Sequence, residues 1–348
     1  MNIDSLVRPN IRKLKPYSSA RSLYKSGVFF DANENAFGSS AELSGYPELN
    51  RYPDPYSSDL RKAISGYLGV ETNNIFAGNG SDEVIDLLIR VFVNPNEAIA
   101  VMEPTYGMYR VAADTAGVKV VSYILDKQFQ IDLASLWKGL SPNIKIIFLC
   151  SPNNPTGNLI RLESIQEICG RFSGIVVVDE AYVEFASTSS LVKEISNFKN
   201  LVVMRTLSKA WGLAGIRIGY AIANEAIVEY LDKVKPPYNI NRVSSALAAQ
   251  ALRNGSAIMT QRRETTLEER TKLSRELEKL GFTVFPSEAN FLLVKHPGIS
   301  NIAKDLAEQD GIIIRNFGNK PMLEDCVRIT VGTPEQNVLL INSLKKRL

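Results

Sequence analysis

The chain has 348 residues, of which 45% are hydrophobic and 22% charged, as is usual for a soluble globular protein of about two domains. Its 40 lysines and arginines against 37 aspartates and glutamates give a net charge of +3, too close to balance to indicate a nucleic-acid-binding face. A single histidine, His296, excludes a His-rich metal site.

Cysteine usage and the N-terminal sequence favour a cytoplasmic location. Cys150, Cys169 and Cys326 are widely spaced and odd in number, which argues against a disulfide framework or a zinc site. No signal peptide is apparent, and no apolar run reaches the ~20 residues of a membrane span. We therefore expect a cytoplasmic protein without a metal site and without nucleic-acid or membrane partners.

Short apolar runs alternate with amphipathic stretches through most of the chain. The apolar runs predict strands at Ile99–Met102, Lys119–Ile124, Ile144–Leu149, Ile175–Val178, Leu201–Met204 and Ile218–Ile222. The amphipathic stretches predict helices at Ser81–Val93, Tyr106–Ala116, Leu162–Phe172 and Glu225–Val234. Continuous apolar strands separated by helices are typical of the α/β class, with a largely parallel sheet buried on both faces.

After Asn254 the pattern changes to that of a smaller α+β unit. A charged helical run, Gln261–Leu280, comes first, Ile312–Ile314 is expected to be a strand, and a final helix begins at Pro334. Other periodic or apolar segments lie at Ala289–Val294, Ile302–Gln309 and Val327–Val331. We predict a large domain over residues 29–254, a small C-terminal domain over residues 255–348, and an N-terminal arm over residues 1–28.

Asp179 stands at the carboxyl end of a predicted buried strand, at the start of the sequence Asp179-Glu-Ala-Tyr182. Sheets of the α/β class place ligands at this edge. A carboxylate that leaves a buried strand needs a cationic partner or strong hydrogen bonds. Asp179 could also simply cap the next turn, and alone it does not decide between the two roles.

Lys209 follows the next predicted strand, within Thr206-Leu-Ser208-Lys209, and Arg217 lies shortly after it. Burial among apolar neighbours would lower the pKa of the lysine toward the neutral, nucleophilic amine. Arg217 lies between two isoleucines, a setting that calls for an anionic partner. Ser208, Lys209 and Arg217 can together supply a hydroxyl, an imine-forming amine and a guanidinium for a phosphate. A solvated lysine is the ordinary alternative.

Three further segments add candidate ligands at the same edge of the sheet. Gly80-Ser81-Asp82 opens a predicted helix, whose first N–H groups can bind phosphate, although Ser81 could be a simple N-cap. Asn154 and Tyr106 each follow a predicted strand. Asn154 could belong to a plain tight turn and Tyr106 to the core, but both positions also lie close to Asp179.

These residue types point to one ligand, pyridoxal phosphate. Lys209 can condense with an aldehyde, Asp179 can pair with a ring nitrogen, and Arg217 can hold a phosphate together with the helix N-terminus. The protonated pyridine of this cofactor withdraws electrons from a carbanion. A ligand of this kind would give each candidate residue a chemical role.

Several motifs are specific enough to carry a family resemblance. Ser151-Pro-Asn-Asn-Pro-Thr-Gly157, Asp179-Glu-Ala-Tyr182 and Ser208-Lys209 mark the cofactor class, and matching stretches also occur at Asp31–Asn35, Asn50–Pro53, Gly80–Glu83, Pro104–Tyr109 and Arg217. On these residues the chain resembles the class I/II-like, fold-type I aminotransferases almost from end to end. The arm Lys15–Arg21 and the stretch Val327–Gly332 narrow the resemblance to the histidinol-phosphate subfamily. Ala36 departs from the pattern, since the family more often has proline after this asparagine.

The resemblance implies a fold and a set of catalytic roles. It implies a large cofactor-binding domain, with a mostly parallel mixed sheet between helices, and a smaller α+β domain to which residues 1–28 contribute in part. Lys209 would bind the cofactor covalently and act as the proton-shuttling base. Asp179 would hold the pyridinium, while Tyr182 and Asn154 would hydrogen-bond to the ring's phenolic oxygen.

The resemblance also implies how the rest of the cofactor is held. Tyr106 would stack on the ring. The phosphate would meet Gly80, Ser81, Asp82, Thr206, Ser208 and Arg217, and also Tyr52 of the neighbouring subunit. The implied assembly is therefore a homodimer with shared active sites.

Arg328 resembles the arginine that binds the substrate carboxylate throughout this superfamily. A second arginine, Arg315, suits a dianionic phosphate better than a monocarboxylate, although it could be a solvated residue at a strand end. We predict that Arg328, Arg315, Tyr17 and Asn33 surround the substrate's anionic group.

The reaction implied is ping-pong transamination between L-histidinol phosphate and 2-oxoglutarate, giving imidazole acetol phosphate and L-glutamate, in histidine biosynthesis. An aromatic amino-acid aminotransferase or a threonine-phosphate decarboxylase of the same fold is the alternative.

Overall fold

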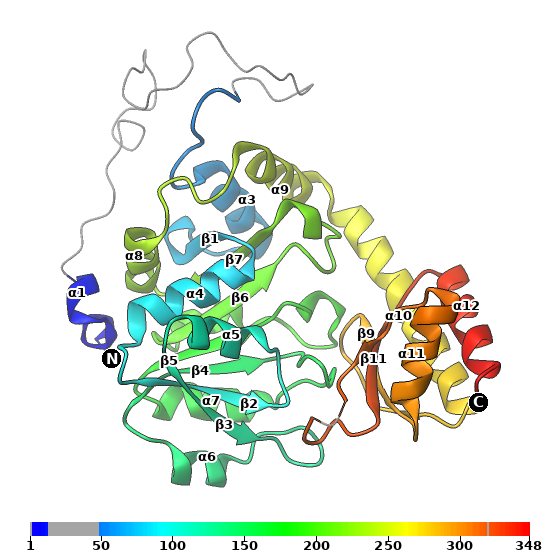
Figure 1. The fold of residues 1–348 in the computed structure, drawn as a ribbon. Helices are drawn as coiled ribbons and strands as arrows, with labels where there is room; N and C mark the ends of the chain where they lie inside the picture. Colours follow the sequence, from blue (N-terminus) through cyan, green and yellow to red (C-terminus); the bar gives the residue numbers. More distant parts are fainter. Residues whose placement is uncertain (1, 13–48, 319) are drawn as a thin grey trace.

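The computed structural model describes residues 2–12, 49–318 and 320–348 as a mixed α/β structure with two sheets (Figure 1). The larger sheet has seven strands in the order β1-β7-β6-β5-β4-β2-β3. The strands are β1 (Ile75–Asn79), β2 (Ala98–Glu103), β3 (Lys119–Ile124), β4 (Ile144–Cys150), β5 (Ile175–Asp179), β6 (Leu201–Thr206) and β7 (Ile218–Ala223). All pairs from β3 to β6 are parallel, whereas β7 is antiparallel to both β6 and β1. The sheet is mostly parallel and mixed, which confirms the predicted fold class.

Helices cover both faces of this sheet because its strands are apolar on both sides. In β5, Val176 and Val178 pack with one group of helices, while Val177 packs with the other. The first group is α3 (Ser58–Leu68), α6 (Leu133–Gly139), α7 (Leu162–Arg171) and α9 (Arg242–Asn254). The second group is α4 (Ser81–Phe92), α5 (Met108–Thr115) and α8 (Glu225–Val234). The sequence pattern did not predict β1, α3, α6 or α9.

The N-terminal residues 2–12 pack on the helices of the large sheet. They form η1 (Ile3–Leu6) and α1 (Pro9–Arg12), and the apolar residues Ile3, Val7 and Ile11 join the core beneath α4 and α8. We expected residues 1–28 to form an arm and to contribute to the small domain. The described part, residues 2–12, packs on helices of the large sheet, because apolar side chains spaced four apart need a surface to cover them. The proposed domain boundaries remain a prediction.

The smaller sheet is antiparallel, in the order β10-β11-β9-β8. Its strands are β8 (Thr283–Val284), β9 (Phe291–Lys295), β10 (Arg315–Asn316) and β11 (Cys326–Thr330), and its helices are α10 (Ser256–Lys279), α11 (Ile299–Asp310) and α12 (Pro334–Lys345). In Figure 1, α10 extends from the large sheet to this smaller unit. Short 3₁₀ helices complete the described chain at η2 (Thr72–Asn74), η3 (Val183–Phe185), η4 (Leu191–Ser196) and η5 (Ala214–Ile216).

The strand expected at Ile312–Ile314 does not form. The Ile312 N–H donates to the carbonyl of Leu306 and so closes the end of α11, and Ile313 is exposed. Pairing with β11 begins only at Arg315. Ile312 and Ile314 are hydrophobic because they pack against the core of the smaller unit just after α11, and strand pairing starts only after them.

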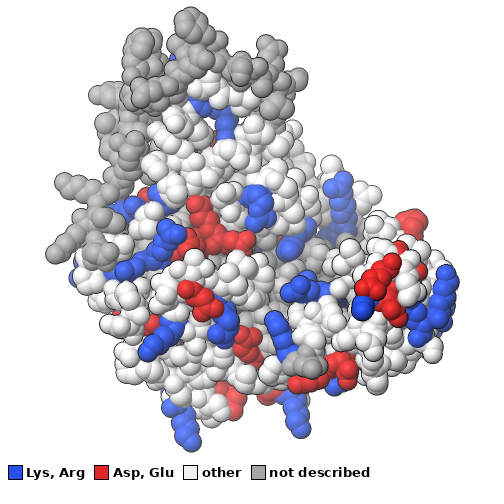
Figure 2. Space-filling view, in the orientation of Figure 1, with Lys and Arg blue, Asp and Glu red and all other residues white. Residues whose placement is uncertain are grey.

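Charges of both signs are interspersed over the described residues of the face shown in Figure 2. This distribution agrees with the near-neutral balance of the sequence. In the described part of the chain, no helix has the length and apolar character required to cross a bilayer.

Candidate active site

A cavity of about 180 Å³ opens at the carboxyl edge of the large sheet. The parallel strands β4, β5 and β6 end there at Cys150, Asp179 and Thr206, and α4 begins there at Ser81. The cavity is lined by Ser81, Asp82, Tyr106, Cys150, Asn154, Asp179, Ala181, Tyr182, Thr206, Ser208, Lys209, Arg217 and Arg328. Parallel strands bring their carboxyl ends to one edge, so residues distant in sequence meet here.

Asp179 is a buried carboxylate at the floor of the site, only 2% exposed. Its Oδ2 accepts a hydrogen bond from the Tyr109 hydroxyl (2.7 Å), and its Oδ1 accepts one from the Ala181 N–H (3.0 Å). Burial raises the pKa of Asp179 to about 6, although both hydrogen bonds act to lower it. The charged form is therefore incompletely stabilised, and a cation beside it would be favoured.

Lys209 reaches the same cavity from the loop between β6 and β7. Its Nζ lies 5.6 Å from the centre of the Tyr182 ring. Partial burial lowers the pKa of Lys209, as does the charge of Arg328, while Asp179 raises it. The residue is nevertheless exposed through the open cavity. It therefore offers an amine that deprotonates more readily than an ordinary lysine and that a ligand can reach.

The N-terminus of α4 forms a second wall of the site. Its N-cap residue, Gly80, has φ 80° and ψ 165° and offers no side-chain cap to the first turn. The N–H groups at such a helix start can bind an anion. Arg217 adopts a left-handed backbone conformation, with φ 54°, and its Nη2 donates to Asp82 Oδ2 at 3.3 Å. The Arg217 side chain is 48% exposed, so the apolar setting expected from its isoleucine neighbours is wrong.

Hydroxyl groups continue this wall. Thr206 is buried, and its Oγ1 accepts a hydrogen bond from the Ser208 N–H at 3.1 Å. The Oγ atoms of the two residues are 3.0 Å apart. Together with the α4 N-terminus and Arg217 they form a compact group of donors suited to a phosphate.

Gly219 allows β7 to approach the start of α4. In the sheet it pairs with Gly78 on one side and Thr206 on the other. A Cβ atom at this position would lie 2.2 Å from the Ser81 nitrogen and 2.5 Å from the Gly80 carbonyl carbon. Sequence reasoning gave this residue no role, although its place two residues after Arg217 was a signal.

Asn154 connects the two sheets at the site. It is buried, its Nδ2 donates to the Tyr182 hydroxyl at 3.3 Å, and its Oδ1 accepts a hydrogen bond from Arg328. The Arg328 guanidinium also lies over the Phe291 ring, 5.3 Å from its centre. The loop after β4 is thus joined directly to β11 of the smaller sheet.

Arg315 and Arg328 lie directly opposite each other across β10 and β11. Burial lowers the pKa of Arg328, and the nearby positive charge of Arg315 lowers it further. Like charges in directly opposed positions destabilise an antiparallel pair. Arg315 is exposed and does not line the cavity itself. The two guanidinium groups therefore mark a place beside the cavity where an anion would relieve repulsion.

Tyr106 lies just before α5, and not inside the helix as predicted, because α5 begins only at Met108. Its hydroxyl donates to Asp82 Oδ1 at 3.2 Å, and its ring lies edge-on to Tyr109. Tyr109, fully buried and bound to Asp179, was missed as a site residue because a tyrosine on an apolar helix face is not distinguishable from core.

Tyr52 lies away from this cavity. It is 46% exposed, and its ring stacks on Tyr238 with centroids 4.5 Å apart. Tyr17 and Asn33 fall outside the described residues. The structure therefore leaves the predicted roles of these three residues untested.

The residues present fit pyridoxal phosphate. The cavity holds a lysine amine for its aldehyde, a buried carboxylate whose hydrogen bonds within the described chain come from neutral groups, which suits its pyridinium, and anion-binding groups at the α4 N-terminus. In the described ranges, no three His, Cys, Asp or Glu side chains come together as a metal site. The donor set favours an organic cofactor with one ring nitrogen and one phosphate.

Replacing Asp179 with asparagine should change the pH dependence of stability. Because burial raises the pKa of Asp179, the folded protein binds more protons here than the unfolded chain between about pH 4 and 6, and stability is lost as the pH rises through 6. Urea unfolding of the two apoproteins should show Asp179→Asn gaining roughly 2 kcal/mol relative to wild type between pH 4.5 and 8.

Asp132→Asn is the control. The Ser135 hydroxyl lowers the pKa of this exposed carboxylate below its ordinary value, so its contribution to stability is already complete at pH 4.5, and that variant should differ from wild type by the same amount at pH 4.5 and pH 8. An Asp179→Asn difference that is the same at both pH values would contradict the assignment of a strained, buried charge.

Gly219→Ala should weaken cofactor binding, because the new methyl group forces the α4 N-terminus to shift. Titration of the apoprotein with pyridoxal phosphate should give a dissociation constant raised at least about tenfold, equivalent to ~1.4 kcal/mol. Gly215→Ala is a matched control nearby, since a Cβ there meets no atom within 4 Å. Equal affinities for the two variants would rule out the close approach as a determinant of binding.

Comparisons with known proteins show the family of the chain. The family model described as "Aminotransferase class I and II" matches residues 31–344. The histidinol-phosphate aminotransferase of Cytophaga hutchinsonii is 44% identical over 99% of both chains. The crystal structure of that from Clostridium acetobutylicum gives a TM-score of 0.79 at 30% identity, covering 86% of this chain and 91% of that one. The crystal structure of the histidinol-phosphate aminotransferase from Sinorhizobium meliloti, in complex with pyridoxal-5'-phosphate, gives a TM-score of 0.80 at 25% identity. It covers 91% of this chain and 90% of that one. The chain therefore belongs to the class I and II aminotransferases, a pyridoxal-phosphate-dependent family, and groups there with the histidinol-phosphate aminotransferases.

Proposed function

We propose that this aminotransferase exchanges an amino group between L-histidinol phosphate and 2-oxoglutarate, giving imidazole acetol phosphate and L-glutamate, as a step of histidine biosynthesis. The observation that carries the proposal is one cavity that combines Lys209, Asp179 and the α4 N-terminus, with Arg315 and Arg328 paired beside it. The names of relatives over 40% identical along nearly the whole chain support the same substrate.

Pyridoxal phosphate, when bound, supplies an aldehyde for the amine and a ring that accepts electrons. Asp179 would hold a positive charge on the ring nitrogen. Its raised pKa favours this role, as do its hydrogen bonds from neutral groups of the described residues. Lys209 would attach the cofactor and then move the proton at the substrate's reacting carbon. Its lowered pKa suits that role, because an amine that gives up its proton more readily than an ordinary lysine is more available as a base.

Other residues would orient the cofactor. Tyr182 and Asn154 already share a hydrogen bond and could both face the phenolic oxygen. Tyr106 could cover one face of the ring from its position above Asp82. The phosphate would be held by Gly80, Ser81, Asp82, Thr206, Ser208 and Arg217, with Arg217 exchanging its contact with Asp82 for the phosphate.

Arg315 and Arg328 would bind the substrate's anionic group, together with Tyr17 and Asn33. Two guanidinium groups can neutralise a dianionic phosphate, and the same pair can take the distal carboxylate of glutamate or 2-oxoglutarate. One anion site would thus serve both half-reactions in turn, which is the requirement of a ping-pong mechanism.

We also propose a cytoplasmic homodimer with shared active sites. The intersubunit role of Tyr52 follows from the family resemblance, and its exposed position outside its own chain's cavity supports it. Three cysteines without disulfide partners suit a reducing compartment.

Lys209→Ala should abolish covalent attachment while leaving the phosphate-binding groups intact. The variant should bind pyridoxal phosphate without the absorbance of the lysine-bound form, and turnover should fall roughly 10³-fold or more. The exposed Lys193→Ala is the control and should behave as wild type. Normal steady-state turnover by Lys209→Ala would overturn the mechanism.

Arg315→Gln should separate the proposed substrate from its alternatives. In single half-reactions without 2-oxoglutarate, the variant should lose about 10- to 100-fold in kcat/KM with histidinol phosphate, as expected for one charge-assisted contact, and much less with phenylalanine. Arg275→Gln, an exposed arginine of α10, is the matched control. The assignment of Arg315 is wrong if only thermal stability changes. Release of carbon dioxide from threonine phosphate would favour the decarboxylase instead.

A further inference from the structure

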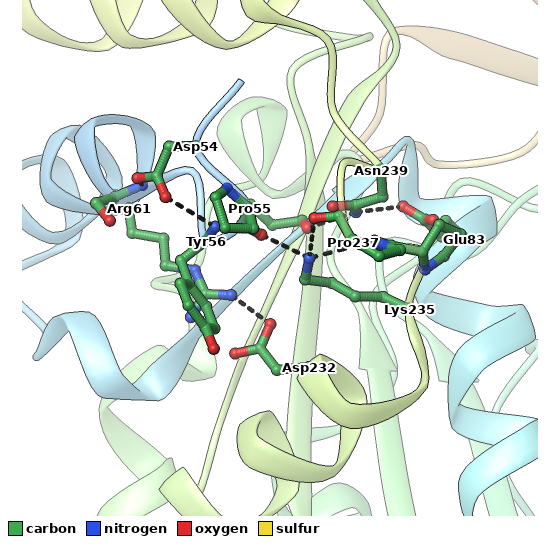
Figure 3. Close-up of polar contacts among 12 residues, drawn as sticks. Asp54, Pro55, Tyr56, Arg61, Glu83, Asp232, Lys235, Pro237 and Asn239 are labelled. Atoms are coloured by element: carbon green, nitrogen blue, oxygen red, sulfur yellow. Dashed lines mark hydrogen bonds and ion pairs between the residues drawn. The ribbon is translucent and has the colours of Figure 1, made fainter. Parts of the chain in front are cut away.

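Lys235, at the C-terminal end of α8, is a buried lysine outside the cavity, 7% exposed. Its Nζ donates to the carbonyl oxygens of Pro55 (2.6 Å), Pro237 (3.1 Å) and Pro236 (3.3 Å). An ammonium group has three N–H donors, so these contacts use all of them. Figure 3 shows the Nζ atom between Pro55 on one segment and Pro237 on another.

Among the described residues, no carboxylate forms an ion pair with Lys235, although Asp232 lies nearby. Asp232 is bound to Arg61, with 2.6 Å between Oδ1 and Nη2. The Lys235 charge is therefore held by backbone dipoles, and burial lowers the pKa of its ammonium. A buried charge is retained at a cost in solvation free energy, which favours a specific role for its contacts over general stabilisation.

The Lys235 contacts join the segment that contains Tyr52 to the segment on which Tyr52 packs. The ring of Tyr52 stacks on Tyr238, just after the proline pair bound by Lys235. The Tyr52 carbonyl also accepts a hydrogen bond from Arg242 Nη2 at 3.3 Å. Segment 52–55 is thus connected to segment 235–242 at both ends, and the buried connection is the Lys235 ammonium.

Segment 235–242 is in turn fixed to residues 79–81 (the phosphate-binding turn), which lead into α4 and are proposed to bind the phosphate of the same subunit. Asn239 Nδ2 donates to Glu83 Oε2 at 2.8 Å and to the Ala77 carbonyl at 3.2 Å. Glu83 Oε2 also accepts the Asn79 N–H at 2.6 Å, immediately before Gly80. Because segment 235–242 is anchored on β1 and α4, loss of the Lys235 contacts would remove the buried one of its connections to the segment that carries Tyr52.

We propose that Lys235 is a positioning residue, which holds Tyr52 in the orientation needed to contact the cofactor phosphate of a neighbouring subunit. The inference rests on the proposed role of Tyr52. Lys235 itself touches neither cofactor nor substrate in this arrangement, and it acts through the Pro55 carbonyl and the Tyr238 ring.

Hydrogen–deuterium exchange of the apoprotein tests whether the Lys235 contacts hold the segment around Pro55 in place. Lys235→Met keeps the side-chain length and removes the donors. Peptides covering residues 54–58, whose Tyr56, Ser57 and Ser58 amides are hydrogen-bonded to Asp54, should exchange faster in this variant. Lys233→Met is the matched control. Lys233 lies two residues before Lys235, on α8, and its ammonium group lies over the Tyr230 ring. Unchanged exchange in Lys235→Met would overturn the proposal.

A double-mutant cycle on cofactor affinity tests the functional part. Tyr52→Phe and Lys235→Met should each raise the dissociation constant of pyridoxal phosphate by roughly tenfold. The dissociation constant of the double variant should exceed that of Tyr52→Phe by at most about twofold. Lys235→Gln, which keeps two donors on a shorter side chain, should lie between wild type and Lys235→Met, and it serves as the test if the methionine variant folds poorly.

The outcomes separate this inference from the proposed function. Suppose that Tyr52→Phe weakens binding, and that Lys235→Met weakens it by the same factor in the wild-type and the Tyr52→Phe protein. Lys235 then supports the fold generally, and this inference fails while the proposed function stands. The inference also fails, and the proposed function stands, if Lys235→Met has no effect on affinity. If Tyr52→Phe leaves affinity unchanged, the intersubunit role of Tyr52 is wrong, and the inference fails with it.

Discussion

The site depends on one unfavourable arrangement, a carboxylate buried at the end of β5. Asp179 is almost fully removed from water, and its two hydrogen bonds, from Tyr109 and Ala181, do not offset the loss of solvation. In the free protein this is a source of instability, and beside a cationic ring nitrogen, as proposed, it would become a source of binding energy. The surrounding residues can be understood as the means of presenting this charge to one kind of ligand.

The antiparallel direction of β7 explains how the residues proposed to hold the phosphate reach the same place. Strands β4 to β6 bring their carboxyl ends to the cavity, whereas β7, running the other way, begins there. Arg217 therefore precedes a strand, and Asp179 ends one, yet both line the cavity. Because β7 also pairs with β1, Gly219 lies against the start of α4, and its missing side chain leaves room for Ser81.

Sequence reasoning located the residues whose chemistry is unusual and missed those whose chemistry is ordinary. Lys209 and Asp179 stand at strand ends, where a charged group needs an explanation, and the structure brings both into one cavity. Tyr109 and Gly219 resemble a core tyrosine and a strand glycine, so only three-dimensional contacts reveal what they do. The short β10 was misplaced because hydrophobicity at Ile312–Ile314 cannot distinguish a helix end from a strand.

The contacts of Glu83 suggest a physical link between the two halves of the proposed shared site. Its carboxylate holds the Asn79 N–H beside the phosphate-binding turn and, through Asn239, the segment on which Tyr52 stacks. One side chain thus contacts both the turn proposed to bind the subunit's own phosphate and the segment of the tyrosine proposed to reach the neighbouring subunit. A shift of the turn on phosphate binding would be transmitted along the segment between Asn239 and Lys235, since both of its ends are anchored. Cofactor binding and subunit association should then reinforce each other, because each stabilises the same arrangement of that segment.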